Sequence, residues 1–325
     1  MKINIGVRIT IGAVLVATLI WVLPWHDVSA AIRRLSLPLW LGALAGFLAG
    51  HRLGAVKWRR LVNAGRAGLG SRDSVRCYAA GLFANLCLPS VIGGDVLRAA
   101  LAARATGRVE ATVLGSIADR LIDLLASGGI IIGAATFAHA AFPGWGSTAL
   151  KVGIALALLV GLALTPLLVR MPLKRWPRRV RRRIGRSLVA LRYVARDTRT
   201  AVFAVAISIC VQTIFILLNV WIGVSIGIDI PLAAWFFAWP LAKFAATIPI
   251  SPGGLGVRDA AFGALLVPLG VPLAVGVVAS LIWQSVLIGG GLLAGLYWWL
   301  NSRKLGLGWP DTAQLAVANP SRNHG

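Results

Sequence analysis

Four long stretches of this chain contain no Asp, Glu, Lys or Arg, and they limit the fold more than any other feature. They are Cys77–Gly94, Leu124–Leu150, Ala201–Ile228 and Ala260–Ser302. A helix needs about 20 apolar residues to cross a hydrocarbon core about 30 Å thick. Hydrophobic residues make up 58% of the chain and charged residues 13%, against roughly 25% charged in soluble domains. The sequence therefore predicts an all-α polytopic membrane protein.

The charge balance is the second constraint, because 33 Lys and Arg residues against 10 acids give a formal net charge of +23. Twelve of these cations lie in residues 170–199, with Asp197 as the one acid. Basic loops stay in the cytoplasm, so this loop and residues 57–76 are predicted to be cytoplasmic. Loop 170–199 lacks the interleaved aromatics of a nucleic-acid surface, having only Trp176 and Tyr193. We expect it to set topology and attract anionic lipid headgroups, with no nucleic acid as partner.

The order of apolar stretches and basic loops predicts six full crossings. They are expected at residues 5–23, 38–56, 111–134, 150–169, 201–224 and 273–300. Segments 77–94 and 231–272 have both flanks on one side, which predicts two re-entrant hairpins, one from each face. Both termini then lie in the cytoplasm, with 305–325 as a short disordered tail after a single domain, 1–304. Val28–Ala30 also resembles a signal-peptidase site, so cleavage of the first segment is an alternative.

The two predicted hairpins share a motif at their tips. Residues Pro89–Arg98 and Pro249–Arg258 both read P-x-x-x-G-G-x-x-x-R, offset by 160 residues. Because the hairpins enter from opposite faces, we interpret the motif as part of an inverted repeat with halves 38–169 and 201–300. Such repeats are typical of secondary transporters, whose substrate sites lie at broken helices near the membrane midplane.

The tips have the chemistry of an anion site. Gly-Gly permits close approach of another group, free amides at a helix N-terminus favour anions, and Arg98 or Arg258 can bind a phosphate in a bidentate manner. The alternative is that the tips only pack, with each arginine paired to its neighbouring acid. The candidate substrate-binding residues here are Pro89, Gly93, Gly94, Asp95, Arg98, Ser251, Gly253, Gly254, Arg258 and Asp259.

A second group of ionisable residues lies inside predicted apolar segments. Its members are Asp119, Arg120, Asp123 and Lys243. Asp119 and Asp123 share one face of a helix, and ionisable groups at membrane depth are functional candidates. We expect Arg120 to neutralise an acid on a neighbouring element, Asp95 or Asp259. A purely structural ion pair is the alternative, and the sequence does not decide whether an aspartate carries a proton or binds a cationic headgroup.

Three blocks in this order resemble the lysylphosphatidylglycerol synthase transmembrane-region family, also called flippase-like domain proteins. They are Leu88–Arg98, Ala118–Arg120 and Ile250–Arg258. The resemblance extends over nearly the whole chain and implies a bacterial or archaeal inner-membrane protein. In bifunctional members this domain is similar to a flippase for aminoacylated phosphatidylglycerol. Those members also carry a soluble aminoacyl-transferase domain, whereas only about 25 residues follow the last span here, so the substrate does not carry over.

The leading hypothesis is a lipid flippase that moves an anionic or aminoacylated (glyco)lipid between leaflets by alternating access. We expect no catalytic residue, cofactor or metal site. One alternative is an intramembrane transferase acting on a lipid phosphate, with Asp95, Asp119 and Asp123 around a divalent metal. The other is a non-catalytic scaffold for a lipid-modifying partner enzyme. The oligomeric state and the energy coupling are left open.

Overall fold

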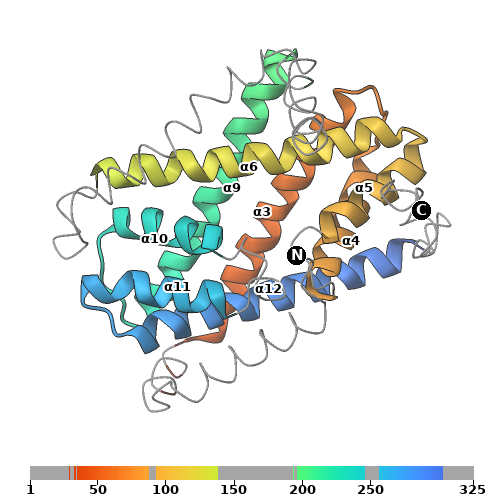
Figure 1. Cartoon of the computed structure of the whole chain (residues 1–325). Helices are drawn as coiled ribbons and strands as arrows, with labels where there is room; N and C mark the ends of the chain where they lie inside the picture. The colour runs from red at the N-terminus through yellow and green to blue at the C-terminus, as the bar shows by residue number, and fades with distance from the viewer. Residues whose placement is uncertain are drawn as a thin grey trace, which may run out of the picture.

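The computed structural model describes residues 35–87, 93–137, 196–245 and 256–302, together with Ser29, Arg33 and Tyr193. Every regular element in these residues is helical, which confirms the all-α part of the predicted fold class (Figure 1). The helices are α3 (Leu37–Asn63), α4 (Ser71–Cys87), α5 (Gly93–Thr106), α6 (Val109–Phe137), α9 (Thr198–Ser225), α10 (Leu232–Ala245), α11 (Val257–Leu266), the 3-10 turn η4 (Val267–Leu269) and α12 (Leu273–Ser302). The predicted spans 5–23 and 150–169, residues 170–192 and the tail 305–325 lie outside the described residues.

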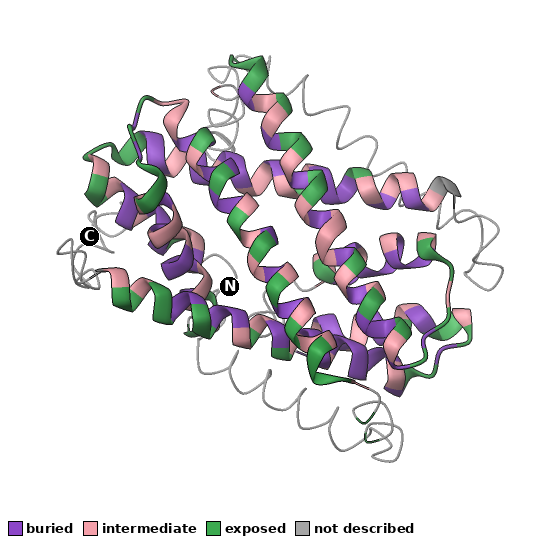
Figure 2. Cartoon of the chain, turned by 180° about the vertical axis from the view of Figure 1, so that it is seen from behind, coloured by how far each residue is buried: buried purple, intermediate pink, exposed green. Residues whose placement is uncertain are grey.

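Three of the described helices, α3, α9 and α12, are long and apolar enough to cross a membrane. Large apolar side chains are exposed along α9 and α12, among them Val202, Ile209, Leu292 and Leu296 (Figure 2). In water this exposure would cost free energy, whereas a bilayer accepts it. The chain is a membrane protein, and the predicted spans 38–56, 201–224 and 273–300 fall within these three helices.

Helix α3 is longer than its predicted span, and this corrects the sequence analysis. The helix continues past Val56 to Asn63, through residues that were assigned to a basic cytoplasmic loop. It continues because Trp58, Leu61 and Val62 are fully buried against the rest of the protein. The connection to α4 is therefore confined to residues 64–70.

Four helices are too short to cross a bilayer. They are α4 with 17 residues, α5 and α10 with 14 each, and α11 with 10. At 1.5 Å per residue they extend about 15 to 26 Å. α4 packs on α5, and α10 packs on α11. α10 and α11 lie within the predicted hairpin 231–272, whereas α4 and α5 extend beyond the predicted hairpin 77–94 on both sides, from Ser71 to Thr106. The connecting residues 88–92 and 246–255 are outside the described part of the chain.

The succession long, short, short, long occurs twice, in α3–α6 and again in α9–α12. In order along the chain, α3, α4, α5 and α6 correspond to α9, α10, α11 and α12. Contacts between corresponding helices recur: α4 packs on α12 as α10 packs on α6, and α3 packs on α6 as α9 packs on α12. α3 and α9 contact each other directly and run in opposite directions (Figure 1). The contact pattern is therefore unchanged when the two sets are exchanged.

The contact between α3 and α9 depends on glycines. Gly42, Gly46 and Gly50 recur every fourth residue of α3, on one face of the helix. A Cβ atom at each would collide with a large side chain of α9. Those side chains are Trp221, Leu218 and Phe215, respectively. The missing Cβ atoms thus let the two helices pack closely.

Candidate functional site

The first cluster of charged residues joins four helices, and we call it the Lys57 cluster. It contains Lys57 of α3, Asp95 and Arg98 of α5, Asp119, Arg120 and Asp123 of α6, and Ser208 of α9. The Lys57 ammonium lies 3.0 Å from Asp119 Oδ1 and 2.5 Å from Asp123 Oδ1, and it donates to Ser208 Oγ at 2.9 Å. The Lys57 and Asp119 side chains are each 3% exposed, so both charges depend on these contacts.

Arg98 connects the cluster to the first predicted tip. Its Nη2 lies 2.7 Å from Asp119 Oδ2 and 3.1 Å from Asp95 Oδ1. The guanidinium also lies over the rings of Trp58 and Tyr78, at 5.2 and 5.0 Å from their centroids, a distance for cation–π attraction. Two carboxylates and two aromatic rings thus surround one buried arginine.

Arg120 occupies the edge of the cluster. Its Nη1 lies 3.7 Å from Asp95 Oδ2, so the predicted pair between Arg120 and Asp95 is present. The pair is long, and Asp95 is shared with Arg98 at the shorter distance of 3.1 Å. The Arg120 side chain is 41% exposed, which leaves much of its charge available to another anion.

The second cluster surrounds Arg258 of α11. Arg258 Nη2 lies 2.9 Å from Asp259 Oδ1 and donates to Gln284 Oε1 at 2.8 Å. Asp259 also accepts from Ser280 Oγ at 2.5 Å and from the Gly256 amide at 3.0 Å. Arg258 is therefore paired with its neighbouring acid, as the packing alternative expected, and Asp259 caps the start of α11.

The two arginines have matching surroundings. Arg98 lies over Tyr78 of α4, and Arg258 lies over Trp239 of α10 at 5.6 Å. The arginines are offset by 160 residues and the aromatic residues by 161. The partners on the long helices differ. Arg98 contacts the carboxylate of Asp119 on α6, whereas Arg258 contacts the neutral amide of Gln284 on α12.

Lys243 of α10 is an exposed cation among interior groups. Its ammonium donates to Gln212 Oε1 of α9 at 3.1 Å, and among the described residues no carboxylate lies within ion-pair distance of it. Gln212 lies one turn of α9 after Ser208 of the Lys57 cluster, on the same helix face. Lys243 therefore lies near that cluster, to which Arg120 also belongs, and is exposed there.

Gly94 serves helix packing. A Cβ atom there would collide with the Gly81 carbonyl oxygen and with Asn85 Oδ1 of α4. The Gly94 amide donates to Asn85 Oδ1 at 3.0 Å. The expected close approach thus occurs, but the approaching group is α4, and the Gly94 amide at the start of α5 is occupied. Gly93 begins α5.

Four predicted tip residues, Pro89, Ser251, Gly253 and Gly254, lie outside the described residues.

The comparisons with known proteins now bear on this site. A family model described as the lysylphosphatidylglycerol synthase TM region matches residues 5–302. The chain belongs to this family. No curated protein and no solved structure matched. The resemblance stated from the sequence blocks is confirmed, and family membership associates the chain with membrane lipids.

Several residues of the site were not predicted from the sequence. Lys57 was assigned to a cytoplasmic basic loop, but it lies inside α3 and pairs with two aspartates. The sequence does indicate that Lys57 is buried, because Gly50, Gly54 and Leu61 lie on the same face of α3 as Lys57. The polar partners Ser208, Gln212, Ser280 and Gln284 were also missed. They are uncharged residues in apolar stretches, and the only signal is that each serine lies four residues before a glutamine, on one helix face.

The arrangement of carboxylates bears on the metal-dependent alternative. Asp95, Asp119 and Asp123 each lie within ion-pair distance of a lysine or an arginine. Within the described ranges, no three His, Cys, Asp or Glu residues are grouped so that they could hold a metal ion. The aspartates of this family member are arranged to neutralise cations.

Proposed function

We propose that this chain is a lipid flippase, which moves an anionic or aminoacylated (glyco)lipid between leaflets of the bacterial inner membrane. Arg120 and Lys243 carry the proposal: the Arg120 side chain is 41% exposed, Lys243 is exposed, and the contacts of both leave charge unmatched. A charge at membrane depth is costly. It is retained where it meets an ion or a substrate.

Counting the charges of the two clusters together with Lys243 supports an anionic substrate. The cations are Lys57, Arg98, Arg120, Lys243 and Arg258, and the acids are Asp95, Asp119, Asp123 and Asp259. The surplus of one positive charge equals the charge of one phosphodiester. Because Lys57, Arg98 and Arg258 are already paired, we assign the phosphate to Arg120 and Lys243 and a positioning role to the paired cations. Asp123, 33% exposed, is suited to accept from a headgroup hydroxyl or ammonium.

Alternating access requires two halves that can exchange roles. The recurring contact pattern of α3–α6 and α9–α12 supports an inverted repeat. The short pairs α4–α5 and α10–α11 support two re-entrant hairpins within six crossings. With the basic ends of the helices in the cytoplasm, both termini are cytoplasmic as well.

Transport of fluorescent short-chain phospholipids in proteoliposomes tests the proposal. The wild-type protein is expected to expose the label to an external quencher faster than protein-free liposomes do. Arg120→Gln and Lys243→Gln each remove a charged contact to phosphate, so each is expected to slow transport at least tenfold. Arg199→Gln, an exposed cation at the start of α9, is the matched control and should keep the wild-type rate.

Two outcomes would overturn the proposal or its site. A wild-type protein no faster than empty liposomes would contradict the flippase. Undiminished transport by the double variant Arg120→Gln/Lys243→Gln would contradict the assigned residues. Conversion of the lipid to a new chemical species would favour the transferase, and lipid modification only with a second protein present would favour the scaffold.

A further inference from the structure

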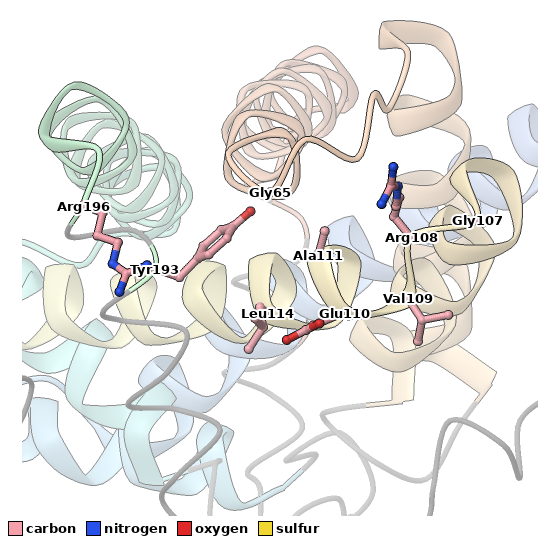
Figure 3. A pocket seen from close by; sticks show the side chains of 9 residues that line it. All are labelled: Gly65, Gly107, Arg108, Val109, Glu110, Ala111, Leu114, Tyr193 and Arg196. Atoms are coloured by element: carbon pink, nitrogen blue, oxygen red, sulfur yellow. The ribbon is translucent and has the colours of Figure 1, made fainter. Parts of the chain in front are cut away.

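A cavity of about 660 Å³ lies at the start of α6, away from both charge clusters (Figure 3). Its walls come from the α3–α4 connection, the first turns of α6 and the residues before α9. This volume falls within the range of about 300–1,000 Å³ that is usual for ligand sites. Arg108 directly precedes α6 and Arg120 lies on it, twelve residues further on, so the cavity is about 18 Å from the proposed transport site.

The polar groups of the cavity lack partners of opposite charge. Arg108 and Arg196 lie at its two ends (Figure 3), and neither has a carboxylate within ion-pair distance in the described part of the chain. Asp197, adjacent to Arg196, accepts from the Thr200 amide at 3.1 Å and from the Thr200 hydroxyl at 2.6 Å. Residues 138–192 contain no Asp or Glu, so that long segment has no carboxylate to offer either arginine.

Tyr193 adds a hydroxyl that is buried and has no hydrogen-bond partner among the described residues. Tyr193 and Leu114 both pack against the buried cluster that contains Leu61, and the hydroxyl points towards Gly65, where a Cβ atom would collide with it (Figure 3). Burial and nearby Glu110 raise the pKa of Tyr193 above its usual value, so the phenol keeps its proton. A buried donor without an acceptor costs about 1–3 kcal/mol.

We propose that this cavity binds the phosphate group of a membrane lipid headgroup, with Arg108, Arg196 and Tyr193 as donors. Two arginines and Glu110 leave one positive charge, which matches a singly charged phosphodiester. Val109, Ala111 and Leu114 form an apolar wall that suits the glycerol and first methylenes of a lipid better than it suits free phosphate. Glu110 accepts from a hydroxyl or ammonium of the headgroup.

Ligand-induced stabilisation of the purified full-length protein in detergent tests the proposal, because it measures binding without transport. The probes are dihexanoyl phosphatidylglycerol, dihexanoylglycerol without phosphate, and inorganic phosphate. The phospholipid is expected to raise the thermal midpoint in a saturable manner. Arg108→Gln and Arg196→Gln are each expected to raise the phospholipid concentration at half-saturation about tenfold. Tyr193→Phe is expected to raise it severalfold. Arg104→Gln and Arg199→Gln, exposed cations outside the cavity, are matched controls and should leave it unchanged.

The outcomes separate the ligand sources and the two sites. Equal stabilisation by dihexanoylglycerol, or equal half-saturation in Arg108→Gln and Arg104→Gln, would overturn the phosphate site. Stabilisation by inorganic phosphate as strong as by the phospholipid would assign the cavity to a soluble anion and overturn the lipid. Binding that is lost in Arg120→Gln but retained in Arg108→Gln would place the lipid at the transport site instead.

Discussion

Lys57 has the most demanding environment of any single residue in the described structure. It lies between Asp119 and Asp123, with the Ser208 hydroxyl as a further partner. Burying a cation costs several kcal/mol, which contacts with anions can offset but seldom exceed. Removing one partner then leaves an uncompensated charge in the interior. The pair is therefore better understood as fixing the relative positions of α3 and α6 than as adding stability.

Lys57→Met is expected to destabilise the protein by about 3–5 kcal/mol, since it leaves two aspartates without their ammonium. The measurement is the free energy of unfolding in detergent, followed by tryptophan fluorescence. Asp73→Asn is the control. It breaks the more exposed pair between Asp73 and Arg76, 3.2 Å apart, and should cost less than about 1 kcal/mol. Similar losses in both variants would contradict the structural role of Lys57.

Asp197 gives a pH dependence outside the membrane. Hydrogen bonds from the Thr200 hydroxyl and amide lower the pKa of this N-cap carboxylate. Because this pKa is lower in the folded than in the unfolded protein, the ionised carboxylate stabilises the fold at pH values above the unfolded pKa of about 3.9. This stabilisation is lost as the pH falls through the pKa of the folded protein. Hydrogen exchange in the first turn of α9, corrected for its intrinsic rate, should thus be constant from pH 7 to 5 and faster below pH 4. Asp197→Asn should remove the dependence; its persistence there would assign it to another group.

At the scale of single residues, the sequence indicates which charged residues belong to the site, but it predicts their ion pairs only in part. The pair between Arg120 and Asp95 was predicted and is present. Lys57 was placed in a loop because counting cations treats neighbours alike, although Lys57 contacts Ser208 inside α9 whereas Arg60 contacts Thr200 in the first turn of α9. Lys57 is buried and Arg60 is exposed. The depth of each contact along α9 decides which cation meets solvent, and the count ignores it.

Among the elements, the glycine seam of α3 determines how closely the two sets of helices approach. Gly46 faces Leu218, and a Cβ atom there would lie 2.8 Å from a methyl carbon of that leucine. Real Cβ contacts need more than 3 Å, so any larger residue must push α9 away. α3 and α9 are the equivalent long helices of the two sets, so their spacing affects both.

Gly46→Leu is expected to destabilise the protein by about 1–3 kcal/mol or more through overpacking. Gly129→Leu on α6 is the matched control, because nothing lies within 4 Å of a Cβ atom at that exposed position. The measurement is the thermal midpoint of both variants in detergent, together with their elution volume in size-exclusion chromatography. A Gly46→Leu midpoint equal to that of Gly129→Leu would mean that α3 and α9 are not packed as described.

Helix positions were predicted well where the apolar signal was long, as for 201–224 within α9 and 273–300 within α12. The end of α3 was wrong because buried Trp58 and Leu61 continue the helix beyond the point where cations begin. The interior of the site depends on which faces meet across helices far apart in sequence, as Lys57 and Ser208 do. Tertiary packing determines that, and a one-dimensional pattern does not contain it.

For the molecule as a whole, similar halves carry different charges. The contact pattern of α3–α6 recurs in α9–α12, yet three aspartates lie in the Lys57 cluster and one, Asp259, lies beside Arg258. In the proposed flippase, the recurring packing would let the halves exchange positions, while the unequal charge would give the lipid different partners on each side.

The charges near the helix ends predict the orientation of the molecule in the membrane. Arg72 lies in the first turn of α4, whereas Asp229 lies between α9 and α10, after the C-terminal end of α9. Arg72→Cys is expected to react with a membrane-impermeant maleimide only after cells are opened, and Asp229→Cys in intact cells. Because the native Cys87 and Cys210 are exposed, both need replacement by alanine first. Labelling of Arg72→Cys in intact cells, or protection of Asp229→Cys there, would reverse the orientation and place the arginine-lined cavity of α6 on the outer face.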